Sequence, residues 1–423
     1  MSTSLSPPVY QTDLFLDQTI YNPGSFVNGQ VTFKLDKKLH CDRITAQLYG
    51  SARVFFVQKY TAPGALVKTK AFEQEIVLVN QSQDLWVTSN ANIQKAMTLD
   101  EIARRASSTA IRLPQEQSAN RPGLEVGNQT FGFSFPLPHR GLYTSFDSKN
   151  SAGYIRYYIL LKVFNGSCVV LRKKLLFPVV VPVILENQLL TQEERVISQR
   201  KQFDKNAYLH VELELEKKMF VPGEPVRGNI FIDNQSGKSV KYANLHIVQD
   251  TVCYSIQPEV QMHESSYKTA GMGLCGEKVQ THDQRRYPIQ FNIPALVPNV
   301  DVPHCLHSDY RLQLDVNFVR GSAKGSPISI KVPIIIGTHM RDNANFPVPS
   351  DNFELPLAPP PYNFTNEILE NSIMERPPAY SPTIGGLSAI DPDAQDGYAP
   401  LCYHYNFGFA VEDEMSGAEK KTQ

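Results

Sequence analysis

The residues whose types and spacing most clearly predict chemistry lie near the end of the chain, where the pattern Pro-Pro-x-Tyr occurs twice. The two copies are Pro359-Pro360-Pro361-Tyr362 and Pro377-Pro378-Ala379-Tyr380, 18 residues apart. Proline holds φ at about −65°, so such a segment already populates the polyproline II helix and loses little entropy in an aromatic-lined groove. The predicted chemistry is non-covalent recognition. In ligands of WW domains the two prolines stack in an aromatic slot and the tyrosine fills a second pocket.

The sequence contains no constellation of residues that predicts catalysis or metal binding. The 10 histidines and 6 cysteines are scattered, without an HExxH or CxxC motif. There is no G-x-S-x-G and no P-loop, and Gly271-x-Gly273-x-x-Gly276 has only the glycine spacing of a dinucleotide fingerprint, in a loop that no helix follows. The sequence therefore predicts that the protein is not an enzyme and has no cofactor and no metal site.

Charge and composition exclude further classes of function. The formal net charge is −1 and 20% of the residues are charged, so no overall basic field indicates nucleic-acid binding. The longest apolar run, Leu175 to Leu185, contains two prolines and is shorter than the roughly 18 residues of a membrane-spanning helix. The cysteines, which no secretory leader precedes, indicate reduced thiols. We expect a soluble, cytoplasmic protein.

An internal duplication is the strongest signal of fold. Residues 21–33 (YNPGSFVNGQVTF) align with residues 220–232 (FVPGEPVRGNIFI) at a constant offset of 199. The Pro-Gly pair suits a type II turn, in which Gly24 or Gly223 takes the position that needs φ > 0. A second shared stretch, 154–163 in the first copy, has an offset of 155, so the first copy contains about 44 extra residues.

Short segments of alternating apolar residues fill both copies, with turn signals about every ten residues. Examples are Ile44 to Tyr49 and Arg53 to Val57 in the first copy and Leu312 to Phe318 in the second. Long helices do not alternate with these strands, which disfavours an α/β fold. The predicted fold is all-β, with two tandem immunoglobulin-like antiparallel β-sandwiches over residues 9–182 and 207–338.

Three segments lie outside this pattern. The extra residues of the first copy predict a helix near 92–112, where Thr98 and Glu101 fit a capping box. Its apolar face either covers the sandwich or contacts a membrane. Residues 183–206 are polar and charged and predict a linker that is partly helical. Residues 339–423 contain 11 of the 30 prolines and few patterned apolar residues, so we expect a disordered tail.

In these motifs the chain resembles the α-arrestin (arrestin domain-containing) family. The resemblance rests on residues 21–29, 153–159, 220–228 and 331–338 together with the two tail motifs, and it covers about residues 10–338. It implies the arrestin fold for both sandwiches. It also implies that the tail recruits WW domains of HECT-type ubiquitin ligases while the arrestin domains hold a transmembrane receptor or transporter as cargo, at the plasma membrane and endosomes.

The basic run Arg172-Lys173-Lys174 stands where another branch of arrestins carries a phosphate-sensing arginine. In that branch an aspartate from a loop completes a salt-bridge switch, but the matching loop here carries Cys275. Two interpretations of the run stay open. It is either a solvated strand end or a contact for phosphate or anionic lipid, with peripheral membrane association as the consequence.

Two functions fit these observations. The first is a non-enzymatic adaptor that recruits a ubiquitin ligase to cargo and so promotes its ubiquitination, endocytosis and sorting. The second is an arrestin-fold trafficking or coat scaffold that sorts cargo without a ligase. A coat subunit has no use for paired Pro-Pro-x-Tyr motifs, so the tail favours the adaptor. A third match, Pro7-Pro8-Val9-Tyr10, ends where the first predicted strand begins, which favours a packed side chain for Tyr10 over a ligand.

Overall fold

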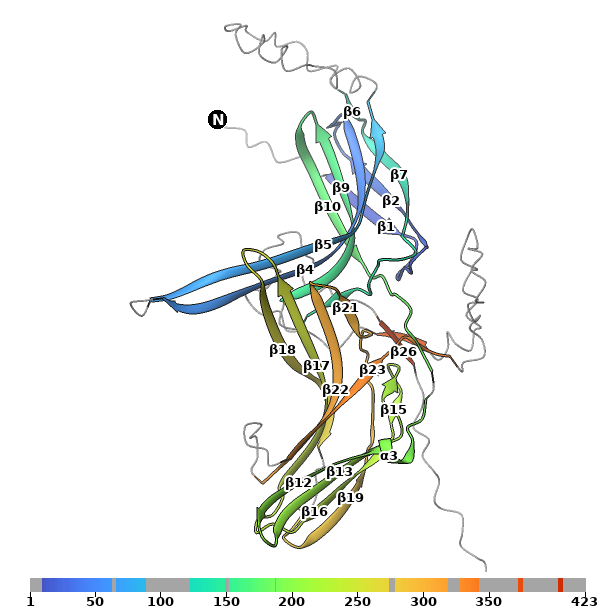
Figure 1. Cartoon of the computed structure of the whole chain (residues 1–423). Coiled ribbons are helices and arrows are strands. Elements are labelled where there is room, and N and C mark those ends of the chain that lie inside the picture. Colours follow the sequence, from blue (N-terminus) through green and yellow to red (C-terminus); the bar gives the residue numbers. More distant parts are fainter. Residues whose placement is uncertain are drawn as a thin grey trace, which may run out of the picture.

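The computed structural model of this chain describes residues 10–62, 66–88, 122–148, 152–186, 188–273, 278–318, 328–341, 372–375 and 402–405. Strands dominate the described part, and two bodies of packed sheets follow each other along the chain (Figure 1). The all-β prediction is confirmed. The predicted helix near 92–112 lies outside the described residues. No helix among the described residues has both the length and the apolar character needed to cross a membrane.

The first sandwich contains a sheet ordered β1-β2-β7 and a sheet ordered β10-β9-β4-β5, in which β8 also pairs with β9; β3 and β6 form a small ribbon. All of these neighbours are antiparallel. The bounds are β1 (Tyr10–Leu16), β2 (Phe26–Leu35), β3 (Leu39–His40), β4 (Arg43–Ala62), β5 (Leu66–Val87), β6 (Gly123–Leu124), β7 (Gly127–Pro136), β8 (Phe146–Asp147), β9 (Gly153–Asn165) and β10 (Cys168–Phe177).

Alternating side chains build the core of the first sandwich. Val31 and Phe33 of β2 are fully buried, and so are Tyr157 and Ile159 of β9, which faces them from the other sheet. Each such apolar side chain stabilises the fold by about 1.5–3 kcal/mol relative to an exposed one. The Tyr157 hydroxyl donates to the carbonyl of Tyr143 at 2.8 Å and so is satisfied inside the core.

The second sandwich contains a sheet ordered β12-β13-β16-β19 and a larger sheet ordered β14-β23-β22-β17-β18, in which β21 also pairs with β22. Its core lies between these sheets and holds many fully buried Leu, Ile and Val side chains. The bounds are β12 (Val196–Asp204), β13 (Ala207–Leu215), β14 (Met219–Phe220), β15 (Pro225–Val226), β16 (Gly228–Asn234), β17 (Tyr242–Ser255), β18 (Gln261–Gly273), β19 (Asp283–Pro288), β20 (Phe291–Asn292), β21 (Val300–Val302), β22 (Leu306–Asn317) and β23 (Ile328–Ile336). Here β14 pairs with β23 in parallel, whereas the other neighbours are antiparallel.

The duplicated Pro-Gly turn occurs in both sandwiches. In residues 22–25 and 221–224 the last amide donates to the first carbonyl, at 3.1 Å in each turn. Gly24 has φ 81° and Gly223 has φ 93°, which confirms the predicted positive φ at both positions. The turn places the following strand in the same way in both sandwiches.

Replacing Gly24 or Gly223 with valine is expected to lower the free energy of unfolding by about 1–3 kcal/mol, because a β-branched residue is strained at φ > 0. At Gly24 a Cβ atom would also lie 2.3 Å from Nδ1 of His139. Urea unfolding followed by circular dichroism measures the loss. Gly237→Ala is a matched control, since a Cβ there meets open space. Unchanged midpoints in both valine variants would contradict the turn assignment.

The range predicted as a linker, 183–206, holds ordered elements. Helix α3 (Gln192–Arg195) is one turn long and begins at Thr191, whose capping box is closed by Glu194. Strand β12 follows it directly and pairs with β13 of the second sandwich. Nearly all side chains of β12 are exposed, because it is an edge strand held by backbone pairing. It therefore lacks the apolar alternation that marks a strand in a sequence.

A two-stranded parallel ribbon joins the start of residues 183–206 to the end of the second sandwich. Strand β11 (Ile184–Leu185) pairs in parallel with β24 (His339–Met340). The hydroxyl of Thr338 accepts from the amide of Val183 at 2.7 Å and donates to its carbonyl at 3.0 Å. The ordered body thus continues two residues beyond 338.

Candidate functional site

Both Pro-Pro-x-Tyr motifs of the tail, Pro359–Tyr362 and Pro377–Tyr380, lie outside the described residues. Two strands of the tail are described, β25 (Ser372–Glu375) and β26 (Cys402–Tyr405), which pair with each other in antiparallel register. Strand β25 ends two residues before Pro377. The second motif therefore belongs to the segment that connects two paired strands, a relation that its own residues do not reveal.

The third match to this pattern runs into the first sheet. Tyr10 is the first residue of β1 and stands opposite Leu35 of β2 in the register of the ladder. A residue in a sheet ladder is committed to extended pairing, whereas a WW ligand must present a free polyproline II segment. Strand pairing therefore disfavours this copy as a ligand.

The basic run lies on β10, the edge strand that pairs with β9. The Lys173 ammonium donates to the carbonyl of Thr12 on β1 and lies 3.9 Å from Oδ1 of Asp13. Lys173 thus connects the two sheets of the first sandwich at their edge. This contact gives Lys173 a role in the fold.

Arg172 and Lys174 belong to the opposite face of β10, since side chains alternate along a strand. Lys174 Nζ lies 4.2 Å from the ring centroid of Tyr158, which lies beside Tyr49, with 5.3 Å between the ring centroids. Arg172 stands opposite Lys162 of β9 and is exposed. The run is therefore divided between the fold and a basic, aromatic outer face. Contact of that face with phosphate or lipid stays a prediction.

An apolar seam joins the two sandwiches. Side chains of the second sandwich belong to the core cluster of the first; they are Cys253, Ala295, Val297, Val300, Val302, Cys305 and Leu306. A Cβ atom on Gly153 of β9 would lie 2.4 Å from Cδ1 of Leu306 and 3.0 Å from Sγ of Cys253. The absence of a side chain at Gly153 lets the two sandwiches approach closely.

Burial controls the chemistry of the thiols in this seam. It raises the pKa of Cys253 to about 12, with a smaller contribution from Cys305, and it also raises the pKa of Cys305 to about 12. A thiol with so high a pKa carries little of the thiolate that reacts with oxidants or metals near neutral pH. These two cysteines are packing residues.

The β4–β5 hairpin forms a second contact between the sandwiches, because it continues past the first sandwich and lies against β17 and β18 (Figure 1). The amide of Glu73 donates to the carbonyl of Gln257 at 3.0 Å, and the hydroxyl of Ser255 donates to the carbonyl of Glu73 at 2.7 Å. The Phe56 ring stacks on His263 of β18 with 5.3 Å between ring centroids. Backbone bonds and stacking thus fix the hairpin on the second sandwich.

A polar network lies beside the seam on β21 and β22. Nε2 of His307 lies 2.6 Å from Oδ2 of Asp309, and Nδ1 lies 3.3 Å from Oδ1 of Asp301. Partial burial lowers the pKa of His307, but the hydrogen bonds and charges of Asp309 and Asp301 outweigh it, so the net pKa is raised. Asn299 donates to Asp309 at 2.9 Å and accepts from the Ile336 amide, which connects the network to the end of β23.

The raised pKa of His307 predicts a pH dependence of stability. Its ion pairs contribute fully below the unfolded-state pKa of about 6.5, and the contribution is lost as pH rises through the higher folded-state pKa. The difference in unfolding free energy between the wild type and His307→Gln should therefore be larger at acidic than at alkaline pH. Urea titrations on both sides of neutrality measure it, and a difference that grows with pH would refute the assignment.

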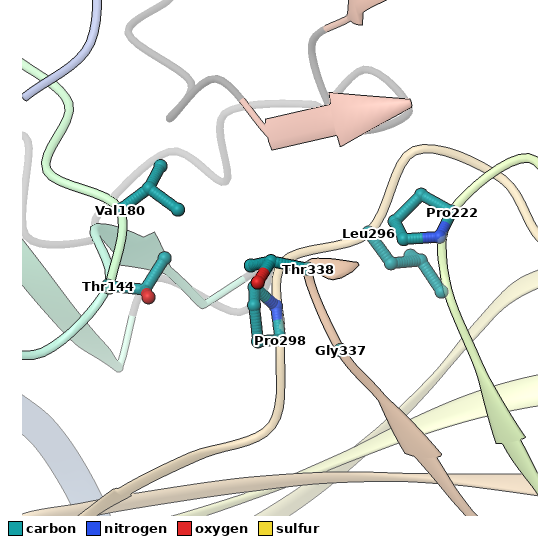
Figure 2. Close-up of a pocket in the computed structure, with 7 residues that line it drawn as sticks. All are labelled: Thr144, Val180, Pro222, Leu296, Pro298, Gly337 and Thr338. Atoms are coloured by element: carbon teal, nitrogen blue, oxygen red, sulfur yellow. The ribbon is translucent and has the colours of Figure 1, made fainter. Parts of the chain in front are cut away.

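A small pocket marks the junction of the two sandwiches (Figure 2). The volume that the centre of a water molecule can occupy in it is about 10 Å³, about enough for one water, and its lining is mostly apolar. Both sandwiches contribute to the lining, which consists of Thr144, Val180, Pro222, Leu296, Pro298, Gly337 and Thr338. Neither its size nor its lining fits a substrate. We interpret it as an imperfection of packing between the sandwiches.

The part of the chain that the structure describes contains no group of three or more His, Cys, Asp or Glu side chains arranged to hold a metal ion. The features that sequence reasoning missed are the seam and the long hairpin. Both depend on contacts between residues far apart in the chain. The one local signal is the run of residues without acidic side chains from Val57 to Phe72.

Comparison with known proteins identifies the class of the second sandwich. Residues 205–340 match the family "Arrestin (or S-antigen), C-terminal domain". The chain is also 24% identical over 337 residues to Protein ttm-2 of Caenorhabditis elegans, a match that covers 77% of this chain and 88% of that protein. Together these similarities support an arrestin-domain family for the chain.

Proposed function

We propose that this chain is a non-enzymatic adaptor of the α-arrestin type. Its tail recruits WW-domain HECT ubiquitin ligases through Pro359–Tyr362 and Pro377–Tyr380. The two sandwiches hold a transmembrane receptor or transporter, which is then ubiquitinated, internalised and sorted. The adaptor works in the cytoplasm and is recruited to the plasma membrane and endosomes.

The observation that carries the proposal is the paired motif directly downstream of an arrestin-like body. An arrestin-domain family indicates a role in trafficking or as an adaptor, and two short recognition motifs beyond the folded body provide a means to bring in a second protein. The seam and the hairpin contacts between the sandwiches favour one rigid surface for cargo, since they combine apolar packing with backbone hydrogen bonds.

Affinity purification of the full chain from cells tests the proposal. The comparison is between the wild type and the variant Tyr362→Ala/Tyr380→Ala. We expect the ligases to be lost from the variant while transmembrane cargo is retained, because the substitutions leave the sandwiches intact. Loss of cargo ubiquitination in the same cells is the functional readout.

The alternative, a trafficking or coat scaffold that works without a ligase, predicts a different outcome. In that case the double tyrosine variant would retain all its partners and sort cargo as the wild type does. A matched control is Tyr398→Ala, which removes another tail tyrosine outside the Pro-Pro-x-Tyr pattern.

A further inference from the structure

The end of the β4–β5 hairpin is an unusual surface, because it exposes apolar side chains beyond the last contact with the second sandwich. Lys70 pairs with Glu259 at 2.6 Å, and Gln58 reaches the carbonyl of Met262 at 3.5 Å. Past these contacts, Tyr60 and Val67 are exposed by 49% and 67%, and Val57, which lies one cross-strand pair before the contacts, is exposed by 51%. The hairpin extends away from both sandwiches in this region (Figure 1).

All charged side chains at this hairpin end are positive. Lys59 and Lys68 are exposed, and no acidic residue occurs between Val57 and Phe72. Within the described residues neither lysine has an ion pair, whereas Lys70 has Glu259. Cross-strand neighbours share a face, so Tyr60 lies with Lys68, and Lys59 lies with Thr69. Apolar and cationic side chains thus occur on both faces of the hairpin end.

Exposed apolar residues interleaved with lysines are the composition of a segment that binds at a membrane interface. The apolar side chains enter the boundary between headgroups and acyl chains, while the ammonium groups contact anionic headgroups. A two-stranded hairpin keeps its backbone bonds paired between its own strands, which limits the cost of placing the backbone near lipid.

We propose that residues 57–60 and 67–69, the hairpin end, dock this protein on an anionic lipid surface. The occupant follows from charge complementarity, since an all-cationic hairpin end attracts a negative surface potential. The neighbouring β17–β18 turn exposes Val260 and Ile256. The carbonyl of Gln257 in that turn accepts a hydrogen bond from the hairpin, so both sandwiches contribute to the proposed lipid-binding surface. This lipid contact is separate from the adaptor function and does not require the tail.

Flotation of the full chain with phosphatidylcholine vesicles, with and without phosphatidylserine, tests the proposal. The wild type should float with the anionic vesicles and much less with the neutral ones, and added salt should weaken binding. Lys59→Glu/Lys68→Glu should weaken binding by at least about 25-fold, since each surface lysine contributes about five-fold. Tyr60→Ser/Val67→Ser should weaken it as well, without removing its dependence on salt.

Matched controls separate this surface from general charge and general exposure. Lys201→Glu/Lys205→Glu changes two exposed lysines on the far sandwich, and Phe15→Ser removes an exposed aromatic ring of the first sheet. Both controls should bind as the wild type does. Thermal unfolding of these hairpin and control variants should show unchanged stability, because each of the altered side chains is exposed.

A fluorescence readout reports contact directly, because the chain contains one tryptophan. In the variant Trp86→Phe/Tyr60→Trp the emission should shift to the blue on anionic vesicles and be quenched by brominated lipid. An unshifted spectrum on vesicles that bind the protein would overturn the proposal, as would hairpin variants that float as well as the wild type. Failure of the wild type to bind anionic vesicles, with hairpin-dependent binding to a membrane protein in neutral nanodiscs, would assign the surface to a protein partner instead.

Discussion

A tandem WW-domain protein is expected to bind the wild-type chain about 10² to 10⁴ times more tightly than it binds the Tyr362→Ala or the Tyr380→Ala variant. Once one motif is bound, the second contact becomes intramolecular at an effective concentration near millimolar. The tyrosines are 18 residues apart, and a flexible segment of that length spans about 23 Å. This reach suits two neighbouring WW domains of one ligase.

Strand β25 lies between the two tyrosines and changes this estimate little. A strand of four residues is about 13 Å long, close to the roughly 11 Å that the same residues span as coil. Its pairing with β26 restrains the four residues of β25 between the two motifs. We therefore expect the gain from bivalency to depend on the spacing of the WW domains.

Calorimetric titration of the wild type and both single variants against tandem and single WW proteins measures the effect. A single WW domain should bind both variants unless its preferred motif is the one removed. If the tandem protein binds the wild type no more tightly than the better single variant, the motifs act independently and the bivalent model is wrong.

Local signals in the sequence predicted local features correctly. The Pro-Gly turns are determined by four residues each, so the positive φ of Gly24 and Gly223 follows from the residue types alone. The buried alternation of β9 likewise requires only a period of two. These signals are sufficient for the all-β class and for the duplication.

Gly50 shows why a local signal can mislead. The sequence predicted separate strands over Ile44 to Tyr49 and Arg53 to Val57, with Gly50 between them. In the structure β4 continues through this point with an irregular register against β5. A Cβ atom on Gly50 would lie 2.3 Å from the ring of Tyr157, so the glycine permits a close approach. That requirement comes from β9, more than a hundred residues later.

The candidate surfaces depend on the same kind of distant contact. The seam joins Gly153 to Leu306, and the hairpin joins Glu73 to Gln257. No periodicity links these residues along the chain, since their proximity arises only when both sandwiches have folded. The tail motifs were recognisable because a WW ligand is read as a short linear segment.

The largest effect on stability is expected from Asp147→Asn. Asp147 of β8 accepts two hydrogen bonds from the Arg156 guanidinium of β9, both at 2.9 Å, and both side chains are nearly buried. Replacing the carboxylate leaves the Arg156 guanidinium without its counter-ion at a site that is largely shielded from water. Such a loss costs about 3 kcal/mol or more.

A double-mutant cycle distinguishes this cause from general disruption of the fold. Asp147→Leu/Arg156→Met removes both charges together, so it should be less destabilising than Asp147→Asn alone, since replacing a buried pair with apolar groups is often close to neutral. Urea unfolding of the wild type, Asp147→Leu, Arg156→Met and the double variant gives the coupling energy. Arg311→Met is a control at an ion pair with Asp250 on the second sandwich, where both partners are more exposed and the expected loss is smaller.

If the double variant loses as much stability as the sum of the singles, the pair is not coupled. Strand β8 would then be held by its backbone bonds to β9, and the ion pair would be incidental to the fold that positions Gly153 against the second sandwich.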